Sequence, residues 1–305
     1  MTKQQNNCIL IFPGQGMPFV GMGKHAYNES IKIKEVWDCA SEISGFDVYN
    51  LCMKGPMNKL VKTRYQQVAV TATNIATLLM LREKVQFNEV GFSGHSAGEY
   101  SALFASNVID LESLFKLINF RSELMQGLSE SKKGVMYVVK NKSNSEVVNL
   151  IDQQGFNGII EICCDNSNNQ QVIGGEILHM EKFINYLYKI KVESLRLNVN
   201  GAWHTRLMED GKKTLEFYLN EFKFSAPEQK IIMNYSAKNA ESSEEIKINL
   251  VKQLTETVRW RETIEEWVSQ YCQNFMEVSC KKSLFYLAVD FPEIKSMIHS
   301  GQFIK

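Results

Sequence analysis

The 305-residue sequence lacks several features that mark large classes of protein. Lysine plus arginine and aspartate plus glutamate both number 34, so no excess charge favours nucleic acid or an anionic membrane. No apolar run could span a membrane, and the first residues lack the apolar stretch of a signal peptide. The seven cysteines form no C-x-x-C pair, which disfavours a structural metal site and suits thiols in a reducing compartment. We therefore expect a soluble, cytoplasmic protein that binds no nucleic acid, membrane or metal.

Proline is also scarce, at five residues, and no low-complexity stretch interrupts the chain. Nothing therefore marks two tandem domains. The composition, 44% hydrophobic and 22% charged, is that of an ordinary globular protein. At this length we expect one large α/β domain, alone or with a small insertion.

The most informative segment is residues 94–98, Gly-His-Ser-Ala-Gly. An apolar stretch precedes it and an Ala-containing apolar stretch follows, which predicts a strand, a sharp turn and a helix. In that order the turn holds Ser96 at a strained corner, with the N–H groups of the helix aimed at the same point. A serine held in this way attacks a carbonyl carbon if a base lies within reach. The alternative is a Gly-rich turn with an incidental serine.

The middle of the chain has its own pattern. Within residues 132–198 the hydrophobic periodicity predicts strand, helix, strand, strand, helix and strand, over 134–139, 144–153, 158–163, 170–173, 178–190 and 192–197. This β-α-β-β-α-β order is typical of a ferredoxin-like unit, inserted here into a larger domain. In the larger part we expect strands at 8–12, 231–235 and 274–278, a buried helix at 67–82, a helix pair over 110–128, and long helices over 207–222 and 245–270.

A serine nucleophile needs a base, and the chain has five histidines. His95 adjoins Ser96, but adjacent side chains on a strained turn diverge. Three others lie in segments away from the turn: His25, His179 and His299. His204 remains, in the junction where the small unit returns to the large one. The alternative is a surface histidine packed on Trp203.

Five segments together resemble malonyl-CoA:acyl carrier protein transacylases and the acyltransferase domains of polyketide synthases. They are residues 11–16, 94–103, 121–126, 201–208 and 253–260. The resemblance implies an α/β fold with an α/β-hydrolase-like catalytic domain, residues 1–131 and 199–305. It also implies an inserted ferredoxin-like subdomain at 132–198.

The resemblance also implies roles for named residues. Ser96 would carry the acyl group as an ester, and His204 would act as its general base and later acid. A main-chain carbonyl near Gln253 would orient the histidine in place of a carboxylate. The backbone N–H groups of Gln15 and Ala97 would form the oxyanion hole.

Arg121 indicates the substrate class. In the family an arginine at this position pairs with the free carboxylate of the malonyl group, which a planar guanidinium binds through two parallel hydrogen bonds. This favours a dicarboxylic acyl group over acetyl or long chains. The alternative is a structural ion pair with Glu123 or Glu99.

The remaining site positions concern the shape of the cleft. His95 and Asn166 match positions that line the site in the family. Trp203 stands where the malonyl-type signature has phenylalanine, and its bulk favours malonyl over methylmalonyl. The chain departs from the family pattern at Met17-Pro18 and at Ser279-Cys280-Lys281.

The expected activity is therefore transfer of malonyl from CoA to the phosphopantetheine thiol of a holo acyl carrier protein, for polyketide or fatty acid synthesis. CoA thioester is a substrate, and no bound cofactor is implied. The resemblance also implies a monomer. Alternatives are an acyl-carrier-protein hydrolase on the same scaffold and a catalytically silent docking protein. The carrier protein is typically acidic, so a basic patch is expected, with six candidates: Lys59, Lys62, Arg64, Arg206, Lys281 and Lys282.

Overall fold

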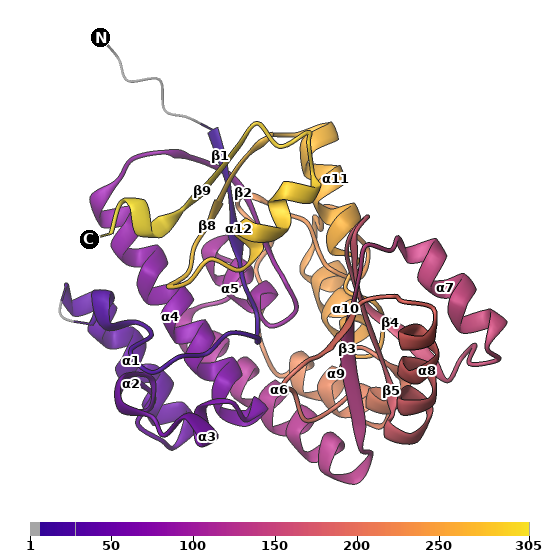
Figure 1. Cartoon of the computed structure of the whole chain (residues 1–305). Helices are drawn as coiled ribbons and strands as arrows, with labels where there is room; N and C mark the ends of the chain where they lie inside the picture. The colour runs from indigo at the N-terminus through magenta and orange to yellow at the C-terminus, as the bar shows by residue number, and fades with distance from the viewer. Residues whose placement is uncertain (1–6, 28, 305) are drawn as a thin grey trace.

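Two separate β-sheets organise the protein, of which the computed structural model describes residues 7–27 and 29–304 (Figure 1). The larger sheet is parallel, in the order β7-β2-β1-β8-β9. Its strands are β1 (Asn7–Phe12), β2 (Asn88–Gly94), β7 (Lys230–Ile231), β8 (Asn274–Glu277) and β9 (Ser296–His299). The central strand, β1, is buried from Cys8 onward, as its continuous apolar run requires.

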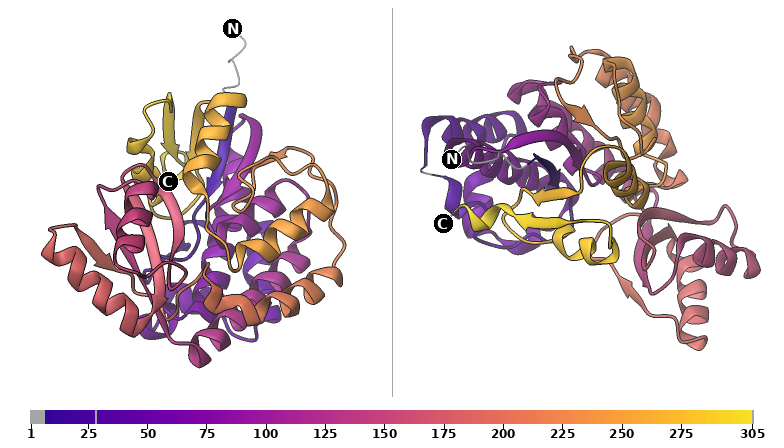
Figure 2. Two further views of the ribbon diagram at one scale, coloured as in Figure 1. Left: turned by 90° about the vertical axis from the view of Figure 1, so that its right-hand side faces the viewer. Right: turned by 90° about the horizontal axis from the view of Figure 1, so that it is seen from above.

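Helices cover both faces of this sheet, as alternate residues of β2 show (Figure 2). Ser93 accepts a hydrogen bond at 2.9 Å from the indole N–H of Trp267 in α11 (Trp260–Gln270). Phe92, on the opposite face, lies against the Arg82 guanidinium of α4 (Thr63–Lys84). The remaining helices of this part are α1 (Ile31–Ser44), α2 (Val48–Lys54), α3 (Met57–Leu60), α5 (Gly98–Ala105), α6 (Leu111–Ser131), α9 (Lys212–Asn220), α10 (Ser243–Gln253) and α12 (Leu284–Leu287). None of the helices in the described ranges is long and apolar enough to cross a bilayer.

The prediction of a helix pair over 110–128 is wrong, because α6 is a single helix. The Asp110 carboxylate caps its first turn by accepting from the Ser113 N–H at 2.7 Å. Its one glycine, Gly127, lies in open space and does not interrupt the backbone hydrogen bonding.

Two further expected elements are shorter than predicted. The helix expected over 245–270 is broken between α10 and α11, because Val258 pairs with the second sheet and its N–H donates to the Cys163 carbonyl at 2.9 Å. The one expected over 207–222 begins as a 3-10 turn, Arg206–Gly211, before α9. The strand expected over 231–235 is reduced to β7.

The second sheet is antiparallel, in the order β4-β5-β3-β6. Its elements are β3 (Gly134–Lys140), α7 (Asn144–Gln153), β4 (Ile160–Ser167), β5 (Gln170–Glu176), α8 (Ile177–Lys189) and β6 (Ser194–Arg196). The chain order is the β-α-β-β-α-β order expected, and these elements bury a small core of their own, separate from the main one. The α/β fold class with two sheets is therefore confirmed, while the domain boundaries at 132 and 198 stay a prediction.

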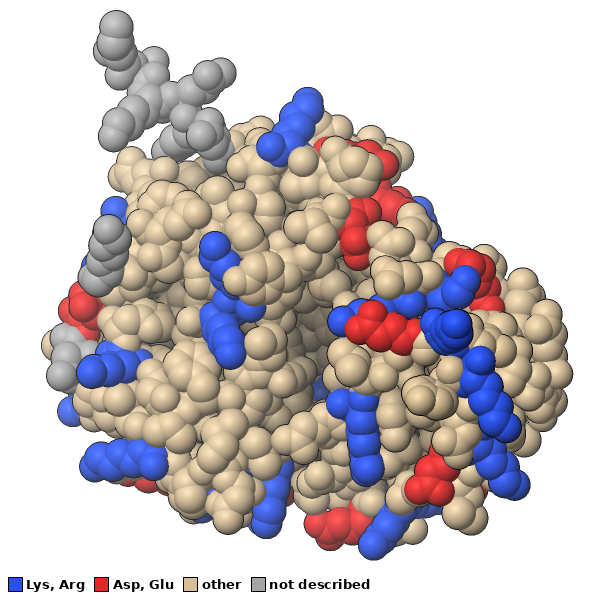
Figure 3. All heavy atoms as spheres, in the orientation of Figure 1, with Lys and Arg blue, Asp and Glu red and all other residues tan. Residues whose placement is uncertain are grey.

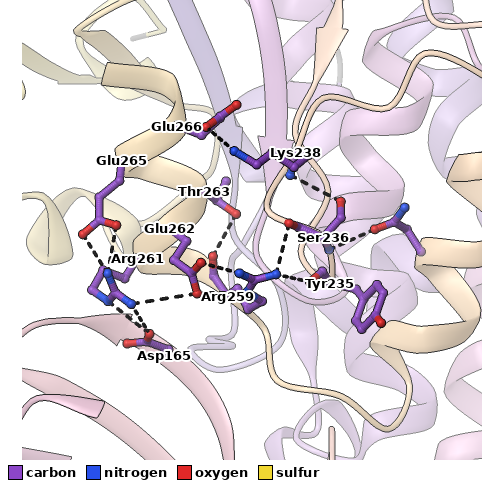
Figure 4. A network of polar contacts seen from close by, with 11 residues as sticks. Asp165, Tyr235, Ser236, Lys238, Arg259, Arg261, Glu262, Thr263, Glu265 and Glu266 are labelled. Carbon is purple, nitrogen blue, oxygen red and sulfur yellow. Dashed lines mark hydrogen bonds and ion pairs between the residues drawn. The ribbon is translucent and has the colours of Figure 1, made fainter. Parts of the chain in front are cut away.

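Polar contacts attach the second sheet to the first along β4. Figure 4 shows Asp165 of β4 meeting the guanidinium of Arg261, which also binds Glu265 on its own helix, α11. The Arg261–Asp165 ion pair spans 3.0 Å, and the Asp165 side chain is almost fully buried. Beside it, Arg259 pairs with Glu262 and donates to main-chain carbonyls of the loop that follows β7. These contacts hold β4 against the start of α11.

A second contact joins the two parts farther along the same sheet. Asp290, after α12, accepts hydrogen bonds from Ser167 Oγ at 2.5 Å and from Asn169 Nδ2 at 3.0 Å. Both donors lie at the turn between β4 and β5. We refer to these three residues as the Asp290 clasp.

The Ser279-Cys280-Lys281 segment forms a hydrogen-bonded turn after β8. The Ser279 hydroxyl lies 3.1 Å from both Glu277 Oε1 and His299 Nε2. The buried Glu277 carboxylate also accepts the backbone N–H groups of Ser283 and Phe285. His299 Nδ1 accepts a hydrogen bond from the Gly301 N–H at 3.0 Å, so its ring is held neutral. Side chains thus fix this turn.

His299 should make the protein less stable in mild acid. Burial, followed by the positive charges of Lys282 and His25, lowers its pKa from 6.5 to about 4. Between these values the unfolded chain binds the proton and the folded chain does not, so stability falls as the pH drops below about 6.5. We expect His299→Gln to remove about 2 kcal/mol of the loss in unfolding free energy between pH 7.5 and 5.0, measured by urea denaturation. Equal losses in variant and wild type would contradict this.

Candidate active site

The turn between β2 and α5 holds Ser96 in a strained conformation. Its φ is +51°, in the left-handed region that side chains other than glycine rarely adopt. The turn is so tight that a Cβ at Gly94 would lie 2.0 Å from the backbone of Gly98. Asn234, after β7, holds the corner from outside: its Oδ1 accepts from the Ser96 N–H and its Nδ2 donates to the Gly94 carbonyl, both at 2.7 Å.

Ser96 and His204 are in hydrogen-bond contact. Ser96 Oγ lies 2.8 Å from His204 Nε2, and His204 Nδ1 lies 2.6 Å from the main-chain carbonyl of Gln253. Because a carbonyl only accepts, the hydrogen of the neutral ring is on Nδ1, and Nε2 is free to accept the serine proton. The alternative of a surface position is wrong, since His204 is 3% exposed.

The charge state of His204 follows from its surroundings. Burial, and then the nearby Arg121 guanidinium and His95, lower its pKa from 6.5 to about 3, against the opposing effect of the hydrogen bond to the Gln253 carbonyl. The imidazole is therefore neutral over the ordinary range of pH, as a general base must be.

Arg121 projects from α6 toward the same serine. The side chain is 1% exposed. Its Nη1 donates to Gln67 Oε1 at 2.6 Å and its Nη2 to Gln253 Oε1 at 2.9 Å, with Ser96 Oγ 3.3 Å from Nη2. These neighbours are neutral oxygen acceptors.

The alternative that Arg121 forms a structural ion pair is wrong. Glu123 pairs instead with Arg64 at 2.9 Å. Within residues 7–27 and 29–304, Arg121 forms no ion pair with Glu99 or any other carboxylate. A buried guanidinium without a partner charge is unfavourable, so the site is suited to an anionic ligand beside Ser96.

The loop after β1 lies against the nucleophile turn. A Cβ at Gly14 would be 2.3 Å from the His95 carbonyl and 3.1 Å from the Ala97 nitrogen, so this close approach requires glycine. The Gln15 side chain is tied to Thr63 Oγ1 at 3.0 Å. Among the described residues, neither the Gln15 nor the Ala97 N–H finds a hydrogen-bond acceptor. Both are left for an oxygen of a ligand.

His95, in the turn after β2, and Asn166, in β4, lie together. His95 Nε2 is 2.8 Å from Asn166 Oδ1 of β4, and the imidazole packs edge-on against Trp260. Trp203 is 5% exposed and has no described partner for its indole N–H. All three residues line the cleft that contains Ser96 and His204.

A cleft of about 550 Å³ lies between the two sheets, with Ser96 and His204 in its lining. Figure 3 shows it as a hollow with Lys and Arg side chains at its margins. Its walls come from the loop after β1, from β3 to β5 and from the α12 segment. The predicted site residues that line it are Gln15, His95, Ser96, Asn166, Trp203 and His204. Arg121 lies beneath this lining.

Sequence reasoning missed three residues that hold the site together: Gln67, Asn234 and Glu99. Gln67 lies in a helix whose apolar surroundings predict only burial. Asn234 is a polar residue directly after a short apolar stretch, which was the available signal. Glu99 follows the nucleophile turn and appeared only as an alternative partner of Arg121.

The fold and this site define an α/β enzyme of acyl chemistry with a serine–histidine pair at the carboxyl edge of its parallel sheet. The model of the acyl transferase domain family matches residues 9–290, and the chain belongs to this family. The resemblance in the five segments is thereby confirmed.

Individual relatives agree. A polyketide biosynthesis malonyl CoA-acyl carrier protein transacylase (PksC) of Bacillus subtilis (strain 168) is 33% identical over 274 residues, covering 88% of this chain and 91% of the relative. A malonyl CoA-acyl carrier protein transacylase of Bacillus subtilis is 29% identical over 260 residues, 85% of this chain, which spans 65% of that relative's length. A solved type II PKS acyl-carrier protein in complex with its malonyl-transacylase contains a similar chain, with TM-score 0.91, 28% identity and 96% of both chains covered.

The neutral His204 predicts a flat pH profile for modification of Ser96. We expect a sulfonyl fluoride to label Ser96 at a rate that changes little between pH 8 and 5, followed by intact-protein mass spectrometry with correction for reagent decay. A histidine of ordinary pKa would slow the reaction about 30-fold over this range. His204→Gln should abolish fast labelling, and Ser96→Ala should give no adduct. A steep fall near pH 6.5 in the wild type would contradict the depressed pKa.

Proposed function

We propose that this chain transfers a malonyl group from CoA to the phosphopantetheine thiol of an acyl carrier protein, through an ester on Ser96. The observation that carries the proposal is the buried Arg121 guanidinium, 3.3 Å from Ser96 Oγ, which forms no direct ion pair with a carboxylate among the described residues. The relatives named as malonyl transacylases support it.

The first half of the cycle follows from the geometry. His204 Nε2 takes the proton of Ser96 as Oγ attacks the thioester carbonyl, and the Gln15 and Ala97 N–H groups stabilise the oxyanion. The carbon–sulfur bond then breaks, and His204 returns the proton to the CoA sulfur. In the second half the carrier thiol repeats these steps on the ester. CoA thioester is a substrate, and the cycle uses no bound cofactor.

Selectivity is assigned to two residues. Arg121 binds the free carboxylate of the malonyl group in a two-point contact, which an acetyl group cannot make. Trp203, in the wall of the cleft, restricts space beside the carbon that bears a methyl branch in methylmalonyl. His95 and Asn166 line the same cleft.

A hydrolase on this scaffold would pass the ester to water. That alternative is not favoured, because the named relatives are transacylases. A catalytically silent docking protein is likewise not favoured, because the chain belongs to an enzyme family and keeps its serine–histidine pair.

The carrier protein is proposed to dock beside the α12 segment. Lys281 and Lys282 precede Ser283, which lines the cleft, and lie over the rings of Phe19 and Phe285. Lys62 and Arg64, two other candidates, line a separate groove. Because the assembled groups come from one chain, a monomer suffices for the cycle. The CoA and carrier substrates suit a cytoplasmic location.

Incubation with malonyl-CoA should give a single malonyl adduct on Ser96, detected by intact-protein mass and peptide mapping, because the Ser96 hydroxyl lines the cleft and contacts a histidine nitrogen that is free to accept its proton. Ser96→Ala should stay unmodified. Addition of holo acyl carrier protein should move the adduct to the carrier thiol. Loss of the adduct to water, with the carrier left bare, would indicate a hydrolase.

Arg121→Ala should reduce malonyl loading about 10²- to 10³-fold, the cost of removing one partner of a buried charge pair. Loading of neutral acyl groups should rise relative to malonyl. The measurement is the single-turnover acylation rate with malonyl-CoA and acetyl-CoA. Lys116→Ala, which breaks an exposed ion pair on the same helix, is the control. Unchanged malonyl preference in Arg121→Ala would exclude the carboxylate role.

A further inference from the structure

Glu99 is a fully buried carboxylate that the proposed cycle does not use. It lies in the first turn of α5, three residues after Ser96. Its Oε1 accepts from the Asn234 backbone N–H and its Oε2 from Gln253 Nε2, both at 2.6 Å. A glutamate in the first turn also interacts favourably with the helix dipole, but this interaction would explain only a contribution to the stability of the fold.

The Gln253 amide connects Glu99 to the site. Its Nε2 donates to Glu99 Oε2 and, at 3.1 Å, to the Ser96 carbonyl. Its Oε1 accepts from Arg121 Nη2 at 2.9 Å. The two ends of this amide therefore face groups of opposite kind, acceptors on one side and a donor on the other.

The orientation of the amide depends on the ionised carboxylate. An ionised Glu99 only accepts, so it selects the NH2 end of Gln253 and leaves the oxygen for Arg121. If Glu99 carried a hydrogen on Oε2, two donors would face each other, because the backbone N–H of Asn234 already occupies Oε1. The Gln253 amide would then turn, giving up its hydrogen bond to the Ser96 carbonyl, and its NH2 group would meet the guanidinium.

Arg121 is sensitive to this change because it has few other restraints. The remaining acceptors of its guanidinium are Gln67 Oε1 and Ser96 Oγ. With Gln253 turned, the Nη2 group loses its acceptor inside a buried site, which is unfavourable, and the guanidinium shifts away from its place beside Ser96.

We propose that Glu99 is a positioning residue that sets acyl-group selectivity: it fixes the Gln253 amide, which holds Arg121 in place for the malonyl carboxylate. The inference rests on the proposed function. A positioning role differs from a purely structural one, because a glutamate that only stabilised the fold would change the loading rates of all acyl groups alike.

Titration of Glu99 offers a readout. Burial raises its pKa to about 8, opposed by Asn234, Arg121 and Gln253. The charged or titratable side chains that act on it are Arg121 of α6 and Tyr100 of α5, and burial raises the pKa of Tyr100 to about 12, above this range. The ionised, selective form of Glu99 therefore gains population as the pH rises through 8.

The test is the ratio of malonyl to acetyl acylation rates, kcat/KM from single-turnover loading, between pH 6.5 and 9. In the wild type the ratio should rise with pH. Glu99→Gln keeps the shape but presents an amide that can donate to Gln253. Its ratio should be at least 10-fold lower at pH 9 and independent of pH. A wild-type ratio and pH profile in Glu99→Gln would overturn the inference.

Three controls separate the possible outcomes. Leu215→Ala, in the buried face of α9, lowers the melting temperature by core damage and should keep the wild-type ratio. In an Arg121→Ala background, Glu99→Gln should leave the ratio unchanged, and a further fall would contradict action through Arg121. If Glu99→Gln does not fold, Glu99→Asp replaces it, since the shorter side chain releases Gln253 and should lower the ratio. A wild type that does not load malonyl at any pH would overturn the proposed function itself.

Discussion

The close approach of β2, the loop after β1 and α5 around Ser96 is the constraint on which the other site contacts depend. Glycine at 94 and 98 lets the backbones meet, because a Cβ at Gly98 would be 2.1 Å from the Phe12 carbonyl. The resulting corner leaves the Ala97 N–H beside the loop that carries Gln15. Since β1 and β2 are parallel neighbours, their carboxyl ends deliver both loops to one edge of the sheet.

Electrostatically, Arg121 is a buried positive charge whose direct hydrogen-bond acceptors are all neutral. Arg121 meets amide oxygens, and its charge helps to keep the pKa of His204 low. A triad carboxylate beside His204 would neutralise Arg121 and compete with an anionic substrate. The main-chain carbonyl of Gln253 orients the imidazole without adding a negative charge. The use of a carbonyl in place of a carboxylate is therefore consistent with an anion-binding cleft.

Local motifs account for the parts of the site that could be predicted. The turn at 94–98 could be predicted because its strand, glycines and helix are contiguous in the sequence. Elimination among the five histidines indicated His204 as the base, and the resemblance indicated Arg121. Asn234, Glu99 and Gln67 could not be found in this way, because their roles arise only when distant segments meet. The break between α10 and α11 has the same cause: Val258 pairs with a strand almost a hundred residues earlier in the chain.

The clasp formed by Asp290 with Ser167 and Asn169 sits where the cleft is bounded by the second sheet. Ser96, His204, Gln253 and Arg121 all lie outside residues 132–198, whereas the cleft wall around Asn166 lies within them. The reacting groups and the cleft wall formed by the second sheet are thus encoded in separate stretches of the gene. Recombination that exchanged the inserted stretch between relatives would alter the fit for acyl chains while leaving the reacting atoms untouched, provided that the partners of Asp290 and Arg261 were retained.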